Sequence, residues 1–196
     1  MRSQCRAREA KVRAGHERVA DANAARRWLL EQSWVTPERT SLLGWSSGAV
    51  ALLWTIRLQA ARAQSGTDFR AAVALYPGCR RLRNAAWSAR VPTLVLIGAV
   101  DDWSPARECE QMVRGARGRS ARASIIVYPG AYHEFDRANR PLRELNGVAY
   151  SVDGSGRVHV GTNPAARRCI QACAAMAGAV RRCATACRGH EPNRLP

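Results

Sequence analysis

The chain has 196 residues, of which 46% are hydrophobic, so it is long enough for one hydrophobic core and too short for two large domains. Its net charge of +16 comes from arginines and the single lysine Lys11, spread along the whole chain without the dense basic cluster and interleaved aromatics of a nucleic-acid surface. No apolar run is long enough to span a membrane and the charged N-terminus is not a secretory signal, so we expect a cytoplasmic protein without nucleic-acid or membrane partners.

The first predicted elements are a helix, a short strand and a second helix. Apolar residues recur at helical spacing over residues 17–33, which predicts an amphipathic helix whose apolar stripe includes Val19 and Trp28. Residues 40–44 predict a short buried strand, and residues 48–63 carry apolar side chains at helical spacing again. A sharp turn therefore joins this strand directly to the second helix.

Three further strands follow, and each is continuously apolar. They are predicted over residues 70–76, 93–98 and 124–128. Continuous apolar runs are typical of strands that helices cover on both faces, and strands alternating with helices are parallel neighbours. A helix is expected to begin near Ser104 and Pro105, with the serine as N-cap and the proline in the first turn. The fold class predicted is α/β, with an open, mainly parallel sheet.

The C-terminal part of the chain has a different pattern. Residues 148–152 and 158–160 flank a turn at 153–156, which indicates a hairpin. The alanine-rich residues 164–188 predict a helix. We therefore expect a main domain over residues 1–168 and an Ala-, Cys- and Arg-rich helix or tail over residues 169–196.

The seven cysteines form no obvious disulfide framework. We expect Cys5, Cys79 and Cys109 to be small apolar residues or exposed thiols. Each of the two tail pairs is spaced by one helical turn, so a metal site or disulfide hairpin is one alternative and incidental thiols are the other. These pairs are Cys169 with Cys173 and Cys183 with Cys187. Three of the four histidines have no partner pattern and are expected at the surface: His16, His159 and His190.

Reactive side chains stand where three of the predicted strands end. Ser46 follows the first strand, Asp101 and Asp102 follow the third, and His133 follows the fourth. Catalytic groups of open α/β sheets gather at the carboxyl ends of the strands. A serine hydroxyl needs a base to become a nucleophile, and the base needs a carboxylate that fixes its tautomer, a role open to Asp101 or Asp102. The order Ser, Asp, His is that of hydrolases with a nucleophile elbow.

The neighbours of these residues have plainer interpretations as well. Gly44 and Gly48 would let the strand turn sharply and hold Ser46 in a strained, exposed position. Ser47 lies one residue too late in the pattern to be the nucleophile. Trp45 is either a substrate-binding wall or a core residue, and Tyr132 beside the base could contact substrate or lie in an exposed loop. Asp102 could instead cap the helix that begins near residue 105.

Five segments carry a resemblance to a known family. They are GWSSGA, RAAVALYPGC, TLVLIGAVDDWSPARECEQM, VYPGAYHEFD and VHVGTNPAAR. From about residue 18 to residue 167, the chain resembles the dienelactone hydrolase family of α/β-hydrolases. The resemblance implies hydrolysis of ester or lactone bonds without a metal or cofactor, with Ser46 as nucleophile, Asp101 as acid and His133 as base. The archetype has a cysteine nucleophile, so the serine favours a broader esterase or lactonase.

The resemblance also implies that the first strands of the sheet are missing. The sheet of this fold begins several strands before the nucleophile, whereas only a charged leader and one helix precede residue 40. We therefore expect an N-terminally shortened, incomplete domain that keeps one oxyanion donor, the backbone N–H of Ser47, and lacks the other. The uncovered sheet edge could pair with a second copy to form a homodimer.

The sequence therefore leaves two main alternatives for the function, and a third that it supports less. The first is a serine hydrolase that cleaves small carboxylic esters or lactones through an acyl-enzyme. The second is a truncated, inactive remnant of an α/β-hydrolase that acts at most as an interaction module. Nucleic-acid binding through the arginine excess is the third.

Overall fold

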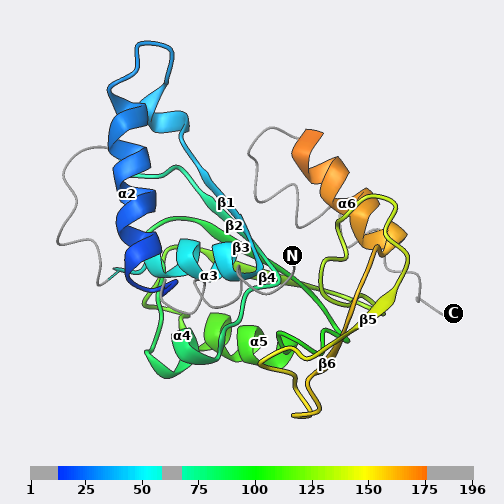
Figure 1. The fold of residues 1–196 in the computed structure, drawn as a ribbon. Coiled ribbons are helices and arrows are strands. Elements are labelled where there is room, and N and C mark those ends of the chain that lie inside the picture. The colour runs from blue at the N-terminus through cyan, green and yellow to red at the C-terminus, as the bar shows by residue number, and fades with distance from the viewer. Residues whose placement is uncertain (1–12, 59–67, 176–196) are drawn as a thin grey trace, which may run out of the picture.

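A four-stranded parallel sheet forms the centre of the chain in the computed structural model, which describes residues 13–58 and 68–175 (Figure 1). Its strands lie side by side in chain order, and their bounds are β1 Leu42–Trp45, β2 Ala72–Leu75, β3 Thr93–Gly98 and β4 Ala123–Tyr128. Every neighbouring pair is parallel, which confirms the expected α/β fold with a mainly parallel sheet. All four strands therefore end at the same edge, where the residues that follow them can meet.

Helices supply the apolar surfaces that cover this sheet. α3 (Ser46–Thr55) packs on β1 and β2, and α5 (Ala106–Gly115) packs on β3 and β4. All six residues of β3 are buried, as the continuous apolar run predicts for a strand between two layers of helix. On α5 the buried residues Cys109, Met112 and Val113 recur at helical spacing and face this core. The short helix α4 (Arg80–Asn84) packs beside α5.

The helix α2 (Glu17–Leu30) exists as predicted, but its predicted apolar stripe is not buried. Trp28 is 56% exposed, and the buried residue of this helix is Arg26. The guanidinium of Arg26 lies 5.2 Å from the centre of the Phe69 ring, so a cation–π contact takes the place of an aliphatic one. The amphipathic assignment was wrong because α2 packs on α3 through a face that the hydrophobic pattern does not mark. The 3-10 turn η1 (Pro37–Arg39) leads from α2 to β1.

The edge of the sheet is formed by β1, which within the described residues pairs with β2 alone. Leu43 of this strand is 55% exposed. Pairing of this edge with a second copy stays a prediction. In the described part of the chain, no helix is both long and apolar enough to cross a membrane.

The predicted hairpin is present, with one strand displaced along the chain. β5 (Arg143–Asn146) pairs antiparallel with β6 (Arg157–Val160), whereas residues 148–152 form no strand. The prediction failed there because Val152 is half exposed and its backbone N–H bonds to the Asp102 carbonyl instead of a hairpin partner. The polar sequence of β5 gives no apolar alternation by which it could have been found.

Cys79 and Cys109 form a disulfide, which corrects the expectation that they are small apolar residues or exposed thiols. Both are buried, and the bond joins the segment after β2 to α5. The two residues are 30 positions apart, and only the alignment of the neighbouring strands β2 and β3 brings their segments together. Sequence spacing carries no sign of such a pairing.

The C-terminal helix α6 (Pro164–Ala175) begins where predicted. Cys183 and Cys187 lie outside the described residues, as does the predicted extension of the helix to residue 188. A metal or disulfide role for the tail cysteines therefore stays a prediction. The same holds for a boundary between a main domain and a tail after residue 168.

Candidate active site

Ser46 stands at a strained turn between β1 and α3. Trp45 is still extended, with φ −120° and ψ 140°, whereas Ser46 has φ 48°, a left-handed conformation that non-glycine residues adopt rarely. Gly44 is required for this turn, because a Cβ there would lie 2.9 Å from the carbonyl oxygen of Gly48. The expectation that Gly48 is needed as well is not supported, since a Cβ at that position would contact nothing within 4 Å.

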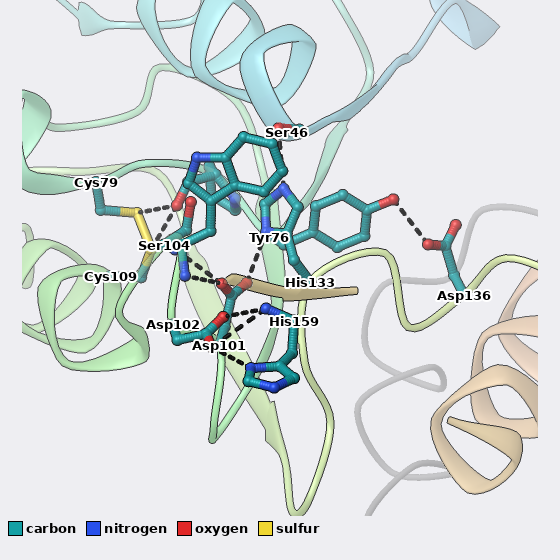
Figure 2. Close-up of polar contacts among 12 residues, drawn as sticks. Ser46, Tyr76, Cys79, Asp101, Asp102, Ser104, Cys109, His133, Asp136 and His159 are labelled. Atoms are coloured by element: carbon teal, nitrogen blue, oxygen red, sulfur yellow. Dashed lines mark hydrogen bonds and ion pairs between the residues drawn. A yellow bond between two sulfur atoms is a disulfide. The ribbon is translucent and has the colours of Figure 1, made fainter. Parts of the chain in front are cut away.

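Ser46, His133 and Asp101 come together at the carboxyl edge of the sheet (Figure 2). His133 Nε2 lies 3.0 Å from Ser46 Oγ, and His133 Nδ1 lies 2.9 Å from Asp101 Oδ2. A carboxylate can only accept at Nδ1, so the imidazole carries its hydrogen there and presents the lone pair of Nε2 to the serine hydroxyl. The arrangement can draw a proton from Ser46 while holding the ring in one tautomer.

Asp101 is fixed by the backbone of the loop after β3. Its Oδ1 accepts from the N–H groups of Trp103, at 3.0 Å, and Ser104, at 2.7 Å, which leaves Oδ2 for His133. Asp101 is 5% exposed and His133 is 1% exposed. Buried polar groups of this kind need partners, and here every oxygen and ring nitrogen of the pair has one.

Asp102 points to a different histidine. Its carboxylate accepts from His159 Nδ1 at 2.7 Å and from the His159 backbone N–H at 2.9 Å, below the Asp101–His133 pair in Figure 2. His159, whose side chain is 37% exposed, therefore has a partner that the sequence did not indicate. Asp102 does not cap α5 either, because that helix has Pro105 as N-cap and no side-chain cap, which also corrects the role expected of Ser104.

Two aromatic rings enclose the imidazole. The ring centres of Tyr76 and Trp103 lie 4.5 Å and 4.9 Å from that of His133. Tyr76 follows β2 directly and has φ 40°, a second left-handed residue at a strand end. Burial, together with the charge of Asp136, raises the pKa of the Tyr76 phenol above its usual range. The phenol therefore acts here as a hydrogen-bond donor.

Asp136 is a site residue that the sequence did not reveal. One of its carboxylate oxygens accepts from Trp45 Nε1–H at 2.7 Å and the other accepts from the Tyr76 hydroxyl at 2.8 Å. Asp136, three residues after His133, thus contacts the end of β1 and the segment after β2. Nothing in the spacing of the sequence could have indicated these contacts, which join residues 91 and 60 positions apart.

The hydroxyl of Ser47, the residue after Ser46, bonds to α2. Ser47 Oγ accepts from Nη1 of Arg18, a residue of α2, at 2.9 Å. Its backbone N–H belongs to the first turn of α3, where such groups have no partner within the helix. This N–H and the positive end of the helix dipole favour negative charge beside Ser46.

The β5–β6 hairpin supports the loop that carries His133. Val160 of β6 forms a parallel bridge with His133, and the Gly161 N–H donates to the His133 carbonyl at 3.1 Å. Tyr132 packs on the His159 ring, with the ring centres 5.0 Å apart. A contact of Tyr132 with substrate stays a prediction. Trp45 precedes Ser46 and is 46% exposed, so it is not a core residue, and its contact with substrate stays a prediction as well.

Two further features of the described residues lie apart from Ser46, His133 and Asp101 or are lacking. Within residues 13–58 and 68–175, no three His, Cys, Asp or Glu side chains converge as the ligands of a metal would. A cavity of about 460 Å³ lies between residues 139–141 and α6, and its lining includes Arg140, Arg167 and Arg168 but none of the residues around Ser46. The geometry suited to covalent chemistry is therefore that of Ser46, His133 and Asp101.

Comparison with known proteins gives a family and a fold. The sequence model of the dienelactone hydrolase family matches residues 2–166, and no curated protein matches the chain. Esterase 2 of Thermogutta terrifontis, phosphoramylated by tabun, is similar in structure, with 18% identity and a TM-score of 0.54 over 66% of this chain and 59% of that one. The Pyrococcus furiosus esterase Pf2001 has 16% identity and a TM-score of 0.50 over 62% and 56% of the respective chains.

A puromycin-hydrolyzing peptidase of Mycobacterium tuberculosis is a third similar structure. It has 18% identity and a TM-score of 0.50, over 62% of this chain and 22% of the peptidase. The chain thus spans less than two thirds of the length of each of these proteins. At such identities the likeness concerns the fold alone.

Proposed function

The chain belongs to the dienelactone hydrolase family, and we propose from this membership that it is a serine hydrolase that cleaves small carboxylic esters or lactones. The observation that carries the proposal is the hydrogen-bonded series from Ser46 Oγ through His133 to Asp101, at 3.0 Å and 2.9 Å. His133 and Asp101 are nearly excluded from solvent, whereas Ser46 is partly exposed. This arrangement suits proton transfer from a serine that a substrate can reach.

In the first half of the reaction, Ser46 Oγ attacks the carbonyl carbon of the ester while its proton passes to His133 Nε2. A tetrahedral intermediate forms, and its oxyanion accepts from the Ser47 backbone N–H at the start of α3. His133 then gives the proton to the leaving alkoxide, so that the alcohol departs and an acyl-Ser46 ester remains. Asp101 keeps Nε2 directed at Ser46 and stabilises the imidazolium that forms.

In the second half, water takes the place of the alcohol. His133 Nε2 accepts a proton from the water as it attacks the acyl carbon, and then returns that proton to Ser46 Oγ. The carboxylic acid is released and the serine is regenerated. In a lactone the leaving alcohol belongs to the acyl chain itself, so both functional groups depart together after the second half.

The surroundings of Ser46 favour uncharged, compact acyl groups. Trp45 lies beside the nucleophile with its indole N–H already bound to Asp136, as is the Tyr76 hydroxyl. The half-exposed Trp45 therefore offers a substrate an apolar ring face, whereas the Tyr76 ring is 3% exposed and packs on His133. The polar atoms of both side chains are occupied. A serine in the place of the archetype's cysteine supports the same broad esterase or lactonase assignment.

A pre-steady-state assay with p-nitrophenyl acetate tests the proposal. We expect a burst of p-nitrophenol equal to the concentration of folded protein, followed by slower turnover, and Ser46→Ala should abolish both. Ser41→Ala is the matched control, because this exposed serine precedes β1 and takes no part in the triad. Equal rates for the wild type and Ser46→Ala would contradict the proposal and leave the inactive remnant as the remaining alternative.

A further inference from the structure

Asp136 joins three segments that meet at the proposed active site. Its carboxylate accepts from Trp45, the residue before the nucleophile, and from Tyr76, whose ring packs on His133, while Asp136 itself belongs to the loop that carries His133. We propose that Asp136 is a positioning residue that holds the nucleophile turn at the correct distance from the catalytic imidazole. This inference rests on the proposed function of the triad.

The first support is where the two hydrogen bonds lie. Asp101 fixes His133 through its bond to Nδ1. Among the described contacts, the side chain of Ser46 has one hydrogen bond, from Oγ to His133 Nε2, so this bond alone does not fix the serine. The Trp45–Asp136 bond, at 2.7 Å, spans the same two segments one residue earlier on β1 and three residues later in the base loop. It therefore restrains the Ser46–His133 distance independently of the reacting atoms.

The second support comes from the Tyr76 ring. The centre of this ring lies 4.5 Å from that of His133, and the far end of the ring is held by Asp136 at 2.8 Å (Figure 2). Rotation of the imidazole toward β2 is thus opposed by a ring that is fixed at both ends. The same carboxylate consequently sets both the nucleophile turn and one wall of the imidazole.

The third support is backbone strain. Ser46 and Tyr76 are left-handed non-glycine residues, with φ 48° and φ 40°, and such conformations persist where the surroundings hold them. Asp136 bonds to Tyr76 itself and to the residue before Ser46, so it holds both strained turns at once. A relaxed turn at either position would redirect the chain after β1 or β2.

The chemistry of the two donors explains why the residue is an aspartate. The indole N–H can only donate, and the phenol donates to the second carboxylate oxygen, so both hydrogen bonds end on a charged acceptor. An asparagine could keep both contacts, with its carbonyl oxygen on the indole N–H and its amide N–H₂ on the phenol oxygen, but without the charge that strengthens them. Asp136→Asn should therefore weaken both bonds while preserving the size of the side chain.

The test measures kcat and KM for p-nitrophenyl acetate in Asp136→Asn and Asp136→Ala. Misplacement of reacting groups by about 1 Å can cost on the order of 10²-fold, so we expect kcat to fall roughly 10- to 100-fold, more in the alanine variant, with KM changed by less than about threefold. Glu134→Gln is the matched control: it removes a carboxylate from the same loop, but one that pairs with Arg137 at 2.7 Å and not with the nucleophile turn. It should keep kcat within about twofold, since an exposed ion pair of this kind contributes little.

Coupling between the variants separates positioning from simple stability. Trp45→Phe should lower kcat by itself, but it should add little to Asp136→Ala, because both changes break the same bond. If Asp136→Ala lowers the melting temperature while kcat per folded molecule stays within twofold of the wild type, the positioning role is refuted. Fully additive losses would refute it as well.

A second measurement keeps the inference separate from the proposed function. If the wild type and Ser46→Ala hydrolyse the ester equally slowly, the proposed function fails, and the positioning effect is then read from the nuclear magnetic resonance signals of the His133 ring. Asp136→Asn should shift both the Trp45 indole N–H, assigned by its loss in Trp45→Phe, and the His133 ring signals, whereas Glu134→Gln should leave the indole signal in place. Unchanged His133 ring signals in Asp136→Asn would overturn the inference.

Discussion

Replacement of Gly98 by alanine should misplace His133, the proposed base, without contacting it. Gly98 ends β3, and a Cβ at this position would lie 2.0 Å from the carbonyl oxygen of Ala131 and 2.6 Å from its carbonyl carbon. Side-chain Cβ atoms keep at least 3.0 Å from such atoms, so the Ala131 carbonyl must move away by roughly 1 Å. The obstacle is backbone, which cannot rotate aside as the end of a flexible side chain can.

The displacement would reach His133, two residues further along the chain. The Nε2 atom of His133 lies 3.0 Å from Ser46 Oγ, close to the upper limit for proton transfer between heavy atoms. A shift of roughly 1 Å lengthens this distance past that limit, and misplacement of this size can cost on the order of 10²-fold in rate. Forcing an extra carbon into a packed site should also lower the free energy of unfolding by about 1–3 kcal/mol.

Gly115→Ala is the matched control, because a Cβ at the end of α5 would contact nothing within 4 Å. Alanine is the better helix former, so this variant should be stabilised by up to about 1 kcal/mol and keep its activity. Urea unfolding followed by circular dichroism gives the stabilities, and the p-nitrophenyl acetate burst gives the acylation rate. A Gly98→Ala protein that acylates within about threefold of the wild type would refute the reasoning.

Three further changes have defined outcomes. Replacing Cys79 and Cys109 by serine should lower the free energy of unfolding by about 3–4 kcal/mol, since their bond closes a loop of 30 residues. Equal urea midpoints for the proteins with and without the bond would contradict this. Hydrogen bonds from Ser155 lower the pKa of Asp153 to about 2. The stability that this carboxylate adds to its loop is therefore fully present above its unfolded pKa near 4 and is lost as the pH falls through 2. A titration of the Asp153 side chain with a midpoint near 4 would refute this. Asp101→Asn should lower kcat by on the order of 10⁴-fold through the wrong imidazole tautomer, whereas Asp102→Asn should keep kcat within about tenfold, and the reverse order would reassign the acid.

The strands could be predicted because their signal is local. β3 matches its predicted range Thr93–Gly98 to the residue, since four consecutive apolar residues, 94–97, stand between Pro92 and Gly98 and leave little freedom in where the strand begins and ends. The serine turn after β1 was equally accessible, because glycine at position 44 and a strand-to-helix change are both local features. Residues at the ends of parallel strands then come together by topology alone.

Features that depend on contacts between distant segments could not be predicted. The apolar stripe assigned to α2 was wrong because a buried arginine over Phe69 has no hydrophobic signal. β5 is polar on every residue but Leu145, so its pairing depends on β6 and not on its own pattern. The Cys79–Cys109 bond shows the same dependence, since neither cysteine stands in a recognisable spacing.

The links that were missed all connect neighbouring segments at the edge where the strands end. Asp136 ties the end of β1 and the segment after β2 to the loop that carries His133. The disulfide ties the segment after β2 to α5, and the Asp102–His159 pair ties the loop after β3 to β6. Strand-end segments are the part of an open sheet with the fewest backbone restraints, and a triad needs positions fixed to within a fraction of an ångström. The strand ends therefore bring Ser46, Asp101 and His133 to one edge, and these side-chain links then hold the distances at which a proton can pass between them.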